Sequence, residues 1–115
     1  MKLSIAKNNY TFGSLAQLCF ELTKTEKTIF ERLRMYERGV AASELAKKLK
    51  KDVTTIQRNL KGLHRKGLVN RKKNGLDEGG YEYLYTAISN AKFKVKVINV
   101  LEDFQISVLE KLREL

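Results

Sequence analysis

The sequence predicts a mostly α-helical fold with one small β-hairpin and a long C-terminal helix, for three reasons. Apolar residues recur at intervals of three and four along most of the chain, as they do on one face of a helix. The segment 68–87 is rich in β-forming residues and is interrupted by a glycine-rich stretch typical of a hairpin loop. The 115 residues contain no proline and no low-complexity run, so we expect one continuous domain.

Two helices are predicted before residue 40. The first lies within 14–22, where Ser14 is the expected cap and the inward stripe is Leu15, Leu18, Cys19 and Leu22. The second begins at Thr23, because Thr23 and Glu26 have the spacing of a capping box, and Gly39 is expected just past its end. Its predicted inward face is Ile29, Phe30, Leu33 and Tyr36.

The middle of the chain has the pattern of a helix-turn-helix. A short helix starts at Ala42 or Ser43 and ends near Leu49, and a turn over 50–52 separates it from a longer helix over 53–66. Asp52 is the expected N-cap of the longer helix and Gly67 the left-handed residue that ends it. An interior glycine, Gly62, costs about 1 kcal/mol, but the apolar spacing continues through it. The predicted inward residues are Val53, Ile56, Leu60 and Leu63.

A hairpin and a last helix complete the prediction. Residues 68–73 and 81–87 form the two strands, joined by a loop over 74–80. Within 92–97 lysines alternate with apolar residues, as in a strand, but from Val97 onward the apolar spacing is helical. We therefore predict one long helix over 89–115 with Ser89 as its cap.

The charge of the chain is concentrated in one segment. The formal net charge is +10, and the segment 47–73 holds eleven basic residues against the single acid Asp52, whereas the rest of the chain is neutral. Lysines and arginines that face phosphates gain affinity by releasing counterions. A charge run is often only a solvated face, but an imbalance confined to one segment favours a nucleic acid as the partner.

Other classes of function are disfavoured by what the sequence lacks. One cysteine and one histidine leave no set of ligands for a structural metal and no evident catalytic constellation, and there is no phosphate-binding loop. We expect a protein that is not an enzyme and holds no metal or cofactor. No run approaches the roughly 20 apolar residues that span a bilayer, and the first residues do not resemble a secretory signal. We therefore expect a cytoplasmic protein without a membrane partner.

Three stretches carry a family resemblance: Ala42 to Leu49, Asp52 to Leu60, and Leu63 to Val69. They resemble the winged-helix transcription regulators of the MarR and TrmB type, particularly the small archaeal members. The resemblance implies a homodimer that docks the third helix of the winged domain in the DNA major groove and lays the hairpin, the wing, along the backbone or minor groove. We accordingly expect an N-terminal helical arm over 1–22, a winged helix-turn-helix domain over 23–88 and a dimerisation helix over 89–115.

The sequence departs from this pattern in two places. Lys50 stands in the turn where the family often has glycine, so we expect the backbone there to differ slightly. Asp77 and Glu78 lie at the expected wing tip, where phosphates would repel them, so the tip is not expected to enter a groove.

The expected DNA contacts divide into two groups. Residues near the start of a recognition helix meet base edges, and the rest of the exposed stripe meets phosphates. The candidate base readers are Thr54, Thr55, Gln57 and Arg58. The candidate phosphate contacts are Lys50, Lys51, Lys61, Arg65, Arg71, Lys72 and Lys73. Thr54 and Gln57 can also be plain solvent-facing helix residues.

The last helix carries a stripe that is too apolar for a lone exposed helix. Pairing with a second copy is the preferred hypothesis, and folding back on its own domain is the alternative. The candidate dimer contacts are Val97, Leu101, Phe104, Val108, Leu112 and Leu115.

Three further interpretations stay open. Cys19 can be a packed thiol, which we favour, or an oxidant sensor as in some MarR-type proteins. Tyr81, Tyr83 and Tyr85 share a strand face and are expected to pack between sheet and helices, although such rings can also stack on single-stranded bases. A sequence-specific regulator of double-stranded DNA is the leading function, with a binder of RNA or single strands and a protein-interaction module as alternatives; any small-molecule effector is unknown.

Overall fold

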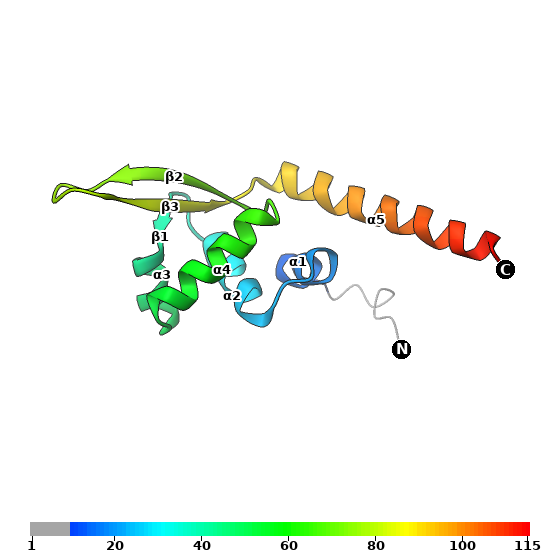
Figure 1. Cartoon of the computed structure of the whole chain (residues 1–115), viewed down its shortest axis with the longest axis horizontal. Helices are drawn as coiled ribbons and strands as arrows, with labels where there is room; N and C mark the ends of the chain where they lie inside the picture. The colour runs from blue at the N-terminus through cyan, green and yellow to red at the C-terminus, as the bar shows by residue number, and fades with distance from the viewer. Residues whose placement is uncertain (1–9) are drawn as a thin grey trace.

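The structure is a computed structural model that describes residues 10–115 and is drawn in Figure 1. The part of the expected N-terminal arm that falls on residues 1–9 lies outside the described residues. Helices and strands follow one another in the predicted order, with one strand that was not predicted. The elements are α1 (Phe12–Phe20), α2 (Lys24–Leu33), β1 (Val40–Ala41), α3 (Ala42–Leu49), α4 (Val53–Arg65), β2 (Val69–Gly75), β3 (Tyr81–Ala87) and α5 (Asn90–Arg113).

The core lies between the helices α2, α3 and α4 and the root of a small sheet. Buried aliphatic and aromatic side chains from every element meet there, so each element packs one of its faces toward a common centre. The mostly α-helical winged helix-turn-helix arrangement predicted from the sequence is thereby confirmed. The largest buried side chains are Phe30, Phe93, Ile29, Leu33, Leu45, Ile56, Leu60, Leu63, Leu68 and Val40.

The sheet has three antiparallel strands in the order β1-β3-β2. The hairpin of β2 and β3 was predicted, and its register pairs Val69 with Ala87 and Gly75 with Tyr81. The two-residue strand β1 was not predicted, because two residues are too short to show an alternating pattern. It pairs with β3, and Gly39 just before it approaches β3 so closely that a Cβ would lie 2.8 Å from the Leu84 Cβ.

The two N-terminal helices differ from the prediction at their ends. The α1 helix begins at Phe12, because the Thr11 hydroxyl accepts a hydrogen bond from the Ser14 amide, so Ser14 is not the cap. Leu18 is 60% exposed rather than inward, and the small residue Ala16 is fully buried in its place. The α2 helix ends at Leu33 and not before Gly39, since amide bonds to carbonyls three residues earlier tighten its last turn.

The α5 helix leaves the domain beside α1 and projects away from it, opposite to the tip of the hairpin (Figure 1). Its Ser89 cap and its length agree with the prediction, because the Ser89 hydroxyl accepts from the Lys92 amide. Phe93 anchors its first turn in the core. The Arg34 guanidinium lies 3.7 Å from the centroid of the Phe12 ring and donates to the Asn90 side chain, which joins α2 to α1 and α5.

Candidate nucleic-acid interface

The α4 helix is held by a cap at its start and by its apolar face. The Asp52 carboxylate accepts a hydrogen bond of 2.8 Å from the Thr55 amide. Hydrogen bonds from the Thr55 hydroxyl and then from its amide lower the pKa of the Asp52 carboxyl, so the cap is charged at neutral pH. Ile56, Leu60 and Leu63 are fully buried as predicted, which fixes the opposite side of α4 toward solvent.

Val53 is an exception to the predicted inward face. It is 39% exposed and lies at the first turn of α4, where it lines a pocket instead of entering the core. The first turn of α4 is therefore less buried than the apolar spacing predicted.

The solvent face of α4 carries the residues that the sequence singled out. The side chains of Thr54, Arg58, Lys61 and Arg65 are exposed on it. Thr55 differs, because it is half-buried and its hydroxyl and amide are engaged by Asp52. Of the four candidate base readers, Thr55 is thus the least available to a ligand.

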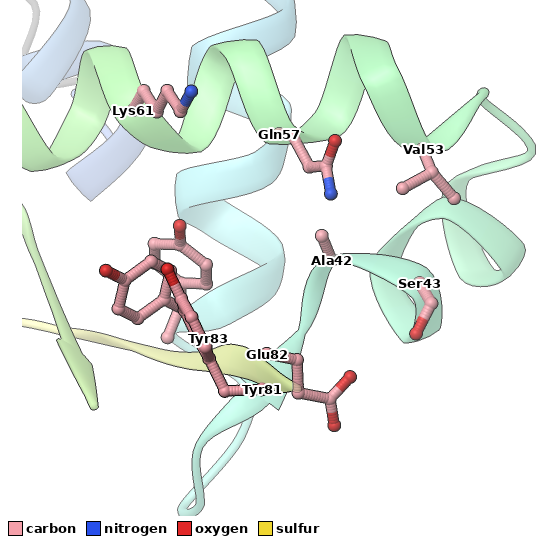
Figure 2. A pocket seen from close by; sticks show the side chains of 9 residues that line it. Ala42, Ser43, Val53, Gln57, Lys61, Tyr81, Glu82 and Tyr83 are labelled. Atoms are coloured by element: carbon pink, nitrogen blue, oxygen red, sulfur yellow. The ribbon is translucent and has the colours of Figure 1, made fainter. Parts of the chain in front are cut away.

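A pocket of about 360 Å³ lies between α4 and β3. In Figure 2 the Gln57 amide points into this pocket from α4, and the side chains of Tyr81 and Tyr83 rise from β3 toward α4. Gln57 and Lys61 therefore share the side of α4 that faces the wing. The lining residues are Ala42, Ser43, Val53, Gln57, Lys61, Tyr81, Glu82, Tyr83 and Tyr85.

The cations of the wing are divided between its two faces. Directly paired residues of an antiparallel sheet point to the same face, and Arg71 pairs with Tyr85 and Lys73 with Tyr83. Arg71 and Lys73 consequently share the tyrosine face, which looks toward α4. Lys72 pairs with Leu84 and points to the opposite face. The three wing cations, which the sequence grouped together, do not share one surface.

The tyrosines are buried to different degrees along β3. Tyr85 is 4% exposed and belongs to the core, Tyr83 is half-buried, and Tyr81 is 52% exposed. The predicted packing between sheet and helices is correct for Tyr85 and is lost gradually toward the wing tip. The tip itself carries the exposed acids Asp77 and Glu78.

The turn before α4 presents Lys50 and Lys51 to solvent. Lys50 ends α3 with φ 56° and ψ 46°, which is the left-handed conformation that glycine adopts at lower cost. The expectation that the backbone differs there because glycine is absent is not supported: Lys50 takes a glycine-like conformation itself.

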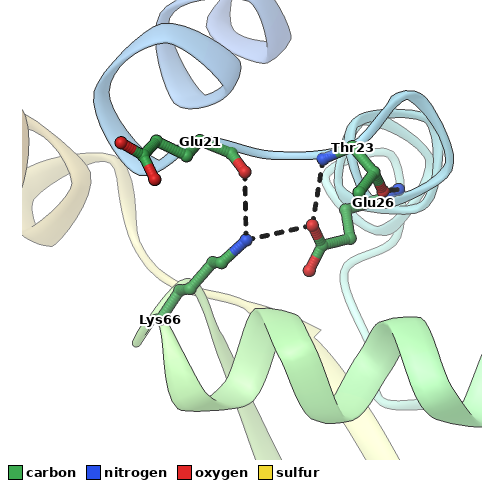
Figure 3. A network of polar contacts seen from close by, with 4 residues as sticks. All are labelled: Glu21, Thr23, Glu26 and Lys66. Atoms are coloured by element: carbon green, nitrogen blue, oxygen red, sulfur yellow. Dashed lines mark hydrogen bonds and ion pairs between the residues drawn. The ribbon is translucent and has the colours of Figure 1, made fainter.

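The C-terminal end of α4 is held by a partly buried ion pair that the sequence did not reveal (Figure 3). The Lys66 Nζ lies 3.0 Å from Oε1 of Glu26 and also donates to the Glu21 carbonyl. The same Glu26 oxygen accepts from the Thr23 amide in the capping box. Only the capping role of Glu26 was visible in the sequence, because its partner lies 40 residues away.

Gly62 is explained by the same acid. A Cβ at this position would overlap the carboxylate of Glu26, which is 6% exposed. Glycine in the interior of α4 therefore lets the buried carboxylate lie against the helix.

The single cysteine lies outside the candidate interface, and the single histidine lies at its margin. Cys19 is half-buried in α1, and burial raises the pKa of its thiol, which favours the packed and unreactive interpretation. His64 is half-buried near the end of α4. Within residues 10–115 there is no cluster of acids, histidines and cysteines suited to a metal ion.

The long α5 helix exposes its apolar side chains. Val97 packs against the core, but Leu101 and Phe104 are 53% and 67% exposed, and the helix does not fold back on its own domain. The exposed apolar residues continue to the end of the chain as Val108, Leu109, Leu112 and Leu115. Among the described helices, none is long and apolar enough to cross a membrane.

Known proteins share both the sequence pattern and the fold. A possible transcriptional regulator from Methanosarcina mazei is 26% identical, with a TM-score of 0.83 over 91% of this chain and 88% of that chain. The ST1889 protein from Sulfolobus tokodaii is 22% identical and has the same fold, with a TM-score of 0.69 over 92% and 99% of the two chains. An uncharacterized protein of Methanocaldococcus jannaschii is 29% identical over 96 residues, which cover 83% of this chain and 71% of that protein.

The family match covers most of the structure just described. Residues 16–91, from α1 through the start of α5, match the family described as "Sugar-specific transcriptional regulator TrmB". This stretch contains the helix-turn-helix, the wing and the capped start of the last helix. The chain therefore belongs to the TrmB family of winged-helix transcriptional regulators.

Proposed function

We propose that this regulator binds double-stranded DNA sequence-specifically as a homodimer, with α4 in the major groove and the wing along the backbone. The observation that carries the proposal is the solvent face of α4. Thr54, Arg58 and Arg65 project from a helix whose other side is locked into the core. A rigid helix with an exposed polar and cationic face fits the width of the major groove.

The residues nearest the start of α4 are the ones that contact the bases in this proposal. Arg58 can donate two hydrogen bonds to the O6 and N7 atoms of guanine, and Gln57 can pair with adenine. Thr54 can contact a base or the methyl group of thymine. Thr55 contributes through the cap, since its amide and hydroxyl hold Asp52.

The cationic side chains around the solvent face of α4 bind phosphates in this proposal. Lys61 and Arg65 continue the exposed stripe of α4, and Lys50 and Lys51 extend it from the preceding turn. Arg71 and Lys73 line the side of the wing that looks toward α4. These contacts position the protein on the duplex and carry no sequence information by themselves.

A structural neighbour supports the choice of DNA. A variant of MepR from S. aureus has been solved bound to an oligodeoxyribonucleotide; it shares 14% identity with this chain and has a TM-score of 0.52. At that identity the likeness concerns the fold alone. It supports the proposal that a protein of this fold binds DNA here.

The proposed dimer forms through α5. Leu101, Phe104 and Leu112 are more than half exposed on one side of a helix that projects away from its own domain. Exposed apolar patches of this extent mark interaction surfaces, and a two-fold interface pairs each patch with its own copy. Such a two-fold dimer presents its two α4 helices to two half-sites a whole number of DNA turns apart, which predicts a pseudo-palindromic site.

We propose an antiparallel pair, whose register the apolar stripe of α5 sets. The apolar stripe from 97 to 115 is centred near residue 106. Cysteines at Leu101 of one copy and Leu112 of the other, in a Cys19→Ala background, should therefore cross-link. Efficient cross-linking of Leu101→Cys with itself would indicate a parallel pair.

The alternative function as a single-strand or RNA binder depends on the three tyrosines. Stacking on bases requires exposed rings. Tyr81 is 52% exposed, whereas Tyr83 is half-buried and Tyr85 lies in the core. This distribution weighs against a stacking platform.

The proposal is tested by titrating the protein with random duplexes and with matched single strands at two salt concentrations. We expect tighter binding to duplex, and an affinity that falls steeply with salt because several counterions are released. Preference for the single strand would favour the alternative. Absence of salt-dependent binding to either would favour a protein-interaction module.

A further inference from the structure

The tyrosines of β3 form a ladder that begins in the core and continues outward along the wing. The ring centroids of Tyr83 and Tyr85 are 6.2 Å apart, and those of Tyr81 and Tyr83 are 5.4 Å apart, both with edge-on geometry. Tyr85 is buried, so each ring outward is supported by one that is held more firmly. The tyrosine face of the wing is thus tied to the domain that carries α4.

Each of the two outer rings holds a cation. The Arg71 guanidinium carbon lies 4.3 Å from the centroid of the Tyr83 ring, and the Lys73 Nζ lies 4.0 Å from the centroid of the Tyr81 ring. Both distances are within the range in which an aromatic ring attracts a cation. The wing cations that face α4 are therefore restrained, although their strands extend beyond the core.

Lys72 provides the contrast within the same strand. It lies between Arg71 and Lys73 in sequence, but its partner across the hairpin is Leu84, on the other face. Of the aromatic rings in residues 10–115, none holds Lys72. The two ring-held cations of the wing lie on the face that looks toward the pocket beneath α4.

We propose that the wing meets the DNA backbone with this tyrosine face rather than with its acidic tip, and that Tyr81 and Tyr83 are positioning residues that hold Lys73 and Arg71 for phosphates. The inference rests on the proposed DNA-binding function and extends it. A free lysine or arginine side chain loses rotamer freedom when it binds a phosphate, whereas a side chain already held over a ring loses less. The acids Asp77 and Glu78 keep the tip away from the backbone.

The test is a double-mutant cycle on duplex affinity with Tyr81→Leu and Lys73→Met. Tyr81→Leu should weaken binding by about two- to fivefold, the usual effect of an exposed cation–ring contact. In the Lys73→Met background, Tyr81→Leu should have no further effect. In the matched Lys72→Met background its effect should be undiminished. Equal effects of Tyr81→Leu in both backgrounds would overturn the inference.

Two further readouts separate positioning from other roles. Tyr81→Phe keeps the ring and should bind like wild type, whereas a loss with phenylalanine would assign the contact to the hydroxyl and contradict positioning. In the free protein, the ring should shift the ε-methylene protons of Lys73 upfield in wild type and Tyr81→Phe, but not in Tyr81→Leu. Absence of this shift in wild type would also overturn the inference. Tyr81 is half exposed, so all these variants should fold.

Failure of the inference is distinguishable from failure of the proposed function. If wild type binds no duplex, both fail. If wild type binds duplex with the expected salt dependence but the cycle is additive, only the role of the tyrosines fails.

Discussion

The α4 and α5 helices carry the same apolar spacing but lie in different surroundings. In α4, Ile56, Leu60 and Leu63 are completely buried in the domain. In α5, Leu101 and Phe104 are 53% and 67% exposed along a helix that leaves the domain. Periodicity therefore identifies a face that requires a partner but does not identify the partner. Within the domain other elements of the chain cover that face, and on α5 we propose that a second copy does.

Charge on the apolar face of α5 should have the largest effect. Replacing Leu101 by lysine and Phe104 by glutamate should raise the dimer dissociation constant by at least about 100-fold, because each buried large apolar side chain contributes roughly 1.5–3 kcal/mol. Light scattering coupled to size exclusion measures the change. Asn99→Lys with Ser107→Glu, on the polar side of α5, is the matched control and should remain dimeric. A dimer that survives the first pair would show that α5 is not the interface.

A substitution that disturbs the packing of α4 against α2 should have the next largest effect, on the stability of the fold. Gly62→Ala should destabilise the fold by about 1–3 kcal/mol although alanine favours helices, because its Cβ would overlap the buried Glu26 carboxylate. Urea unfolding measures the change. Gly75→Ala in the wing is the control, since a Cβ there meets no atom within 4 Å. A stabilised Gly62→Ala variant would mean that the Glu26 carboxylate is not held in place against α4.

A substitution in the turn between α3 and α4 should change the stability of the fold by a smaller amount and in the opposite direction. Lys50→Gly should stabilise the fold by about 1 kcal/mol, because glycine adopts the left-handed conformation without a steric penalty. The same change should weaken duplex binding if Lys50 contacts phosphate. Lys51→Gly removes the same charge at a residue without positive φ, and should weaken binding without stabilising the fold. Equal stability changes in the two variants would contradict this account of the turn.

The sequence predicted most of the features that depend on local chemistry, although it placed the cap of α1 at Ser14 instead of Thr11. The caps at Thr23, Asp52 and Ser89 and the left-handed Gly67 involve residues a few positions apart, and the structure contains all of them. The exposure of Thr54, Arg58, Lys61 and Arg65 followed from the burial of the opposite face.

Features that depend on distant contacts were not predicted. The Glu26–Lys66 pair and the strand β1 join residues about 40 or more positions apart, and nothing in the local pattern marks them. Lys72 and Lys73 lie on different faces because side chains alternate along a strand. The register of the hairpin, which its longer loop leaves open in the sequence, decides which of the two shares a face with the tyrosines. Val53 was wrongly expected in the core, because helical spacing does not show at which residue of a helix the packing against other elements ends.

The most direct measurement of the central claim is the sequence preference of wild type, Arg58→Ala and Lys61→Ala, each selected against random duplexes. We predict that Arg58→Ala loses discrimination at one G·C pair per half-site, worth about 1–3 kcal/mol, and keeps the preference elsewhere. Lys61→Ala should weaken all sequences alike and reduce the salt dependence. Identical sequence preferences for wild type and Arg58→Ala would contradict the proposal that α4 reads DNA through this face.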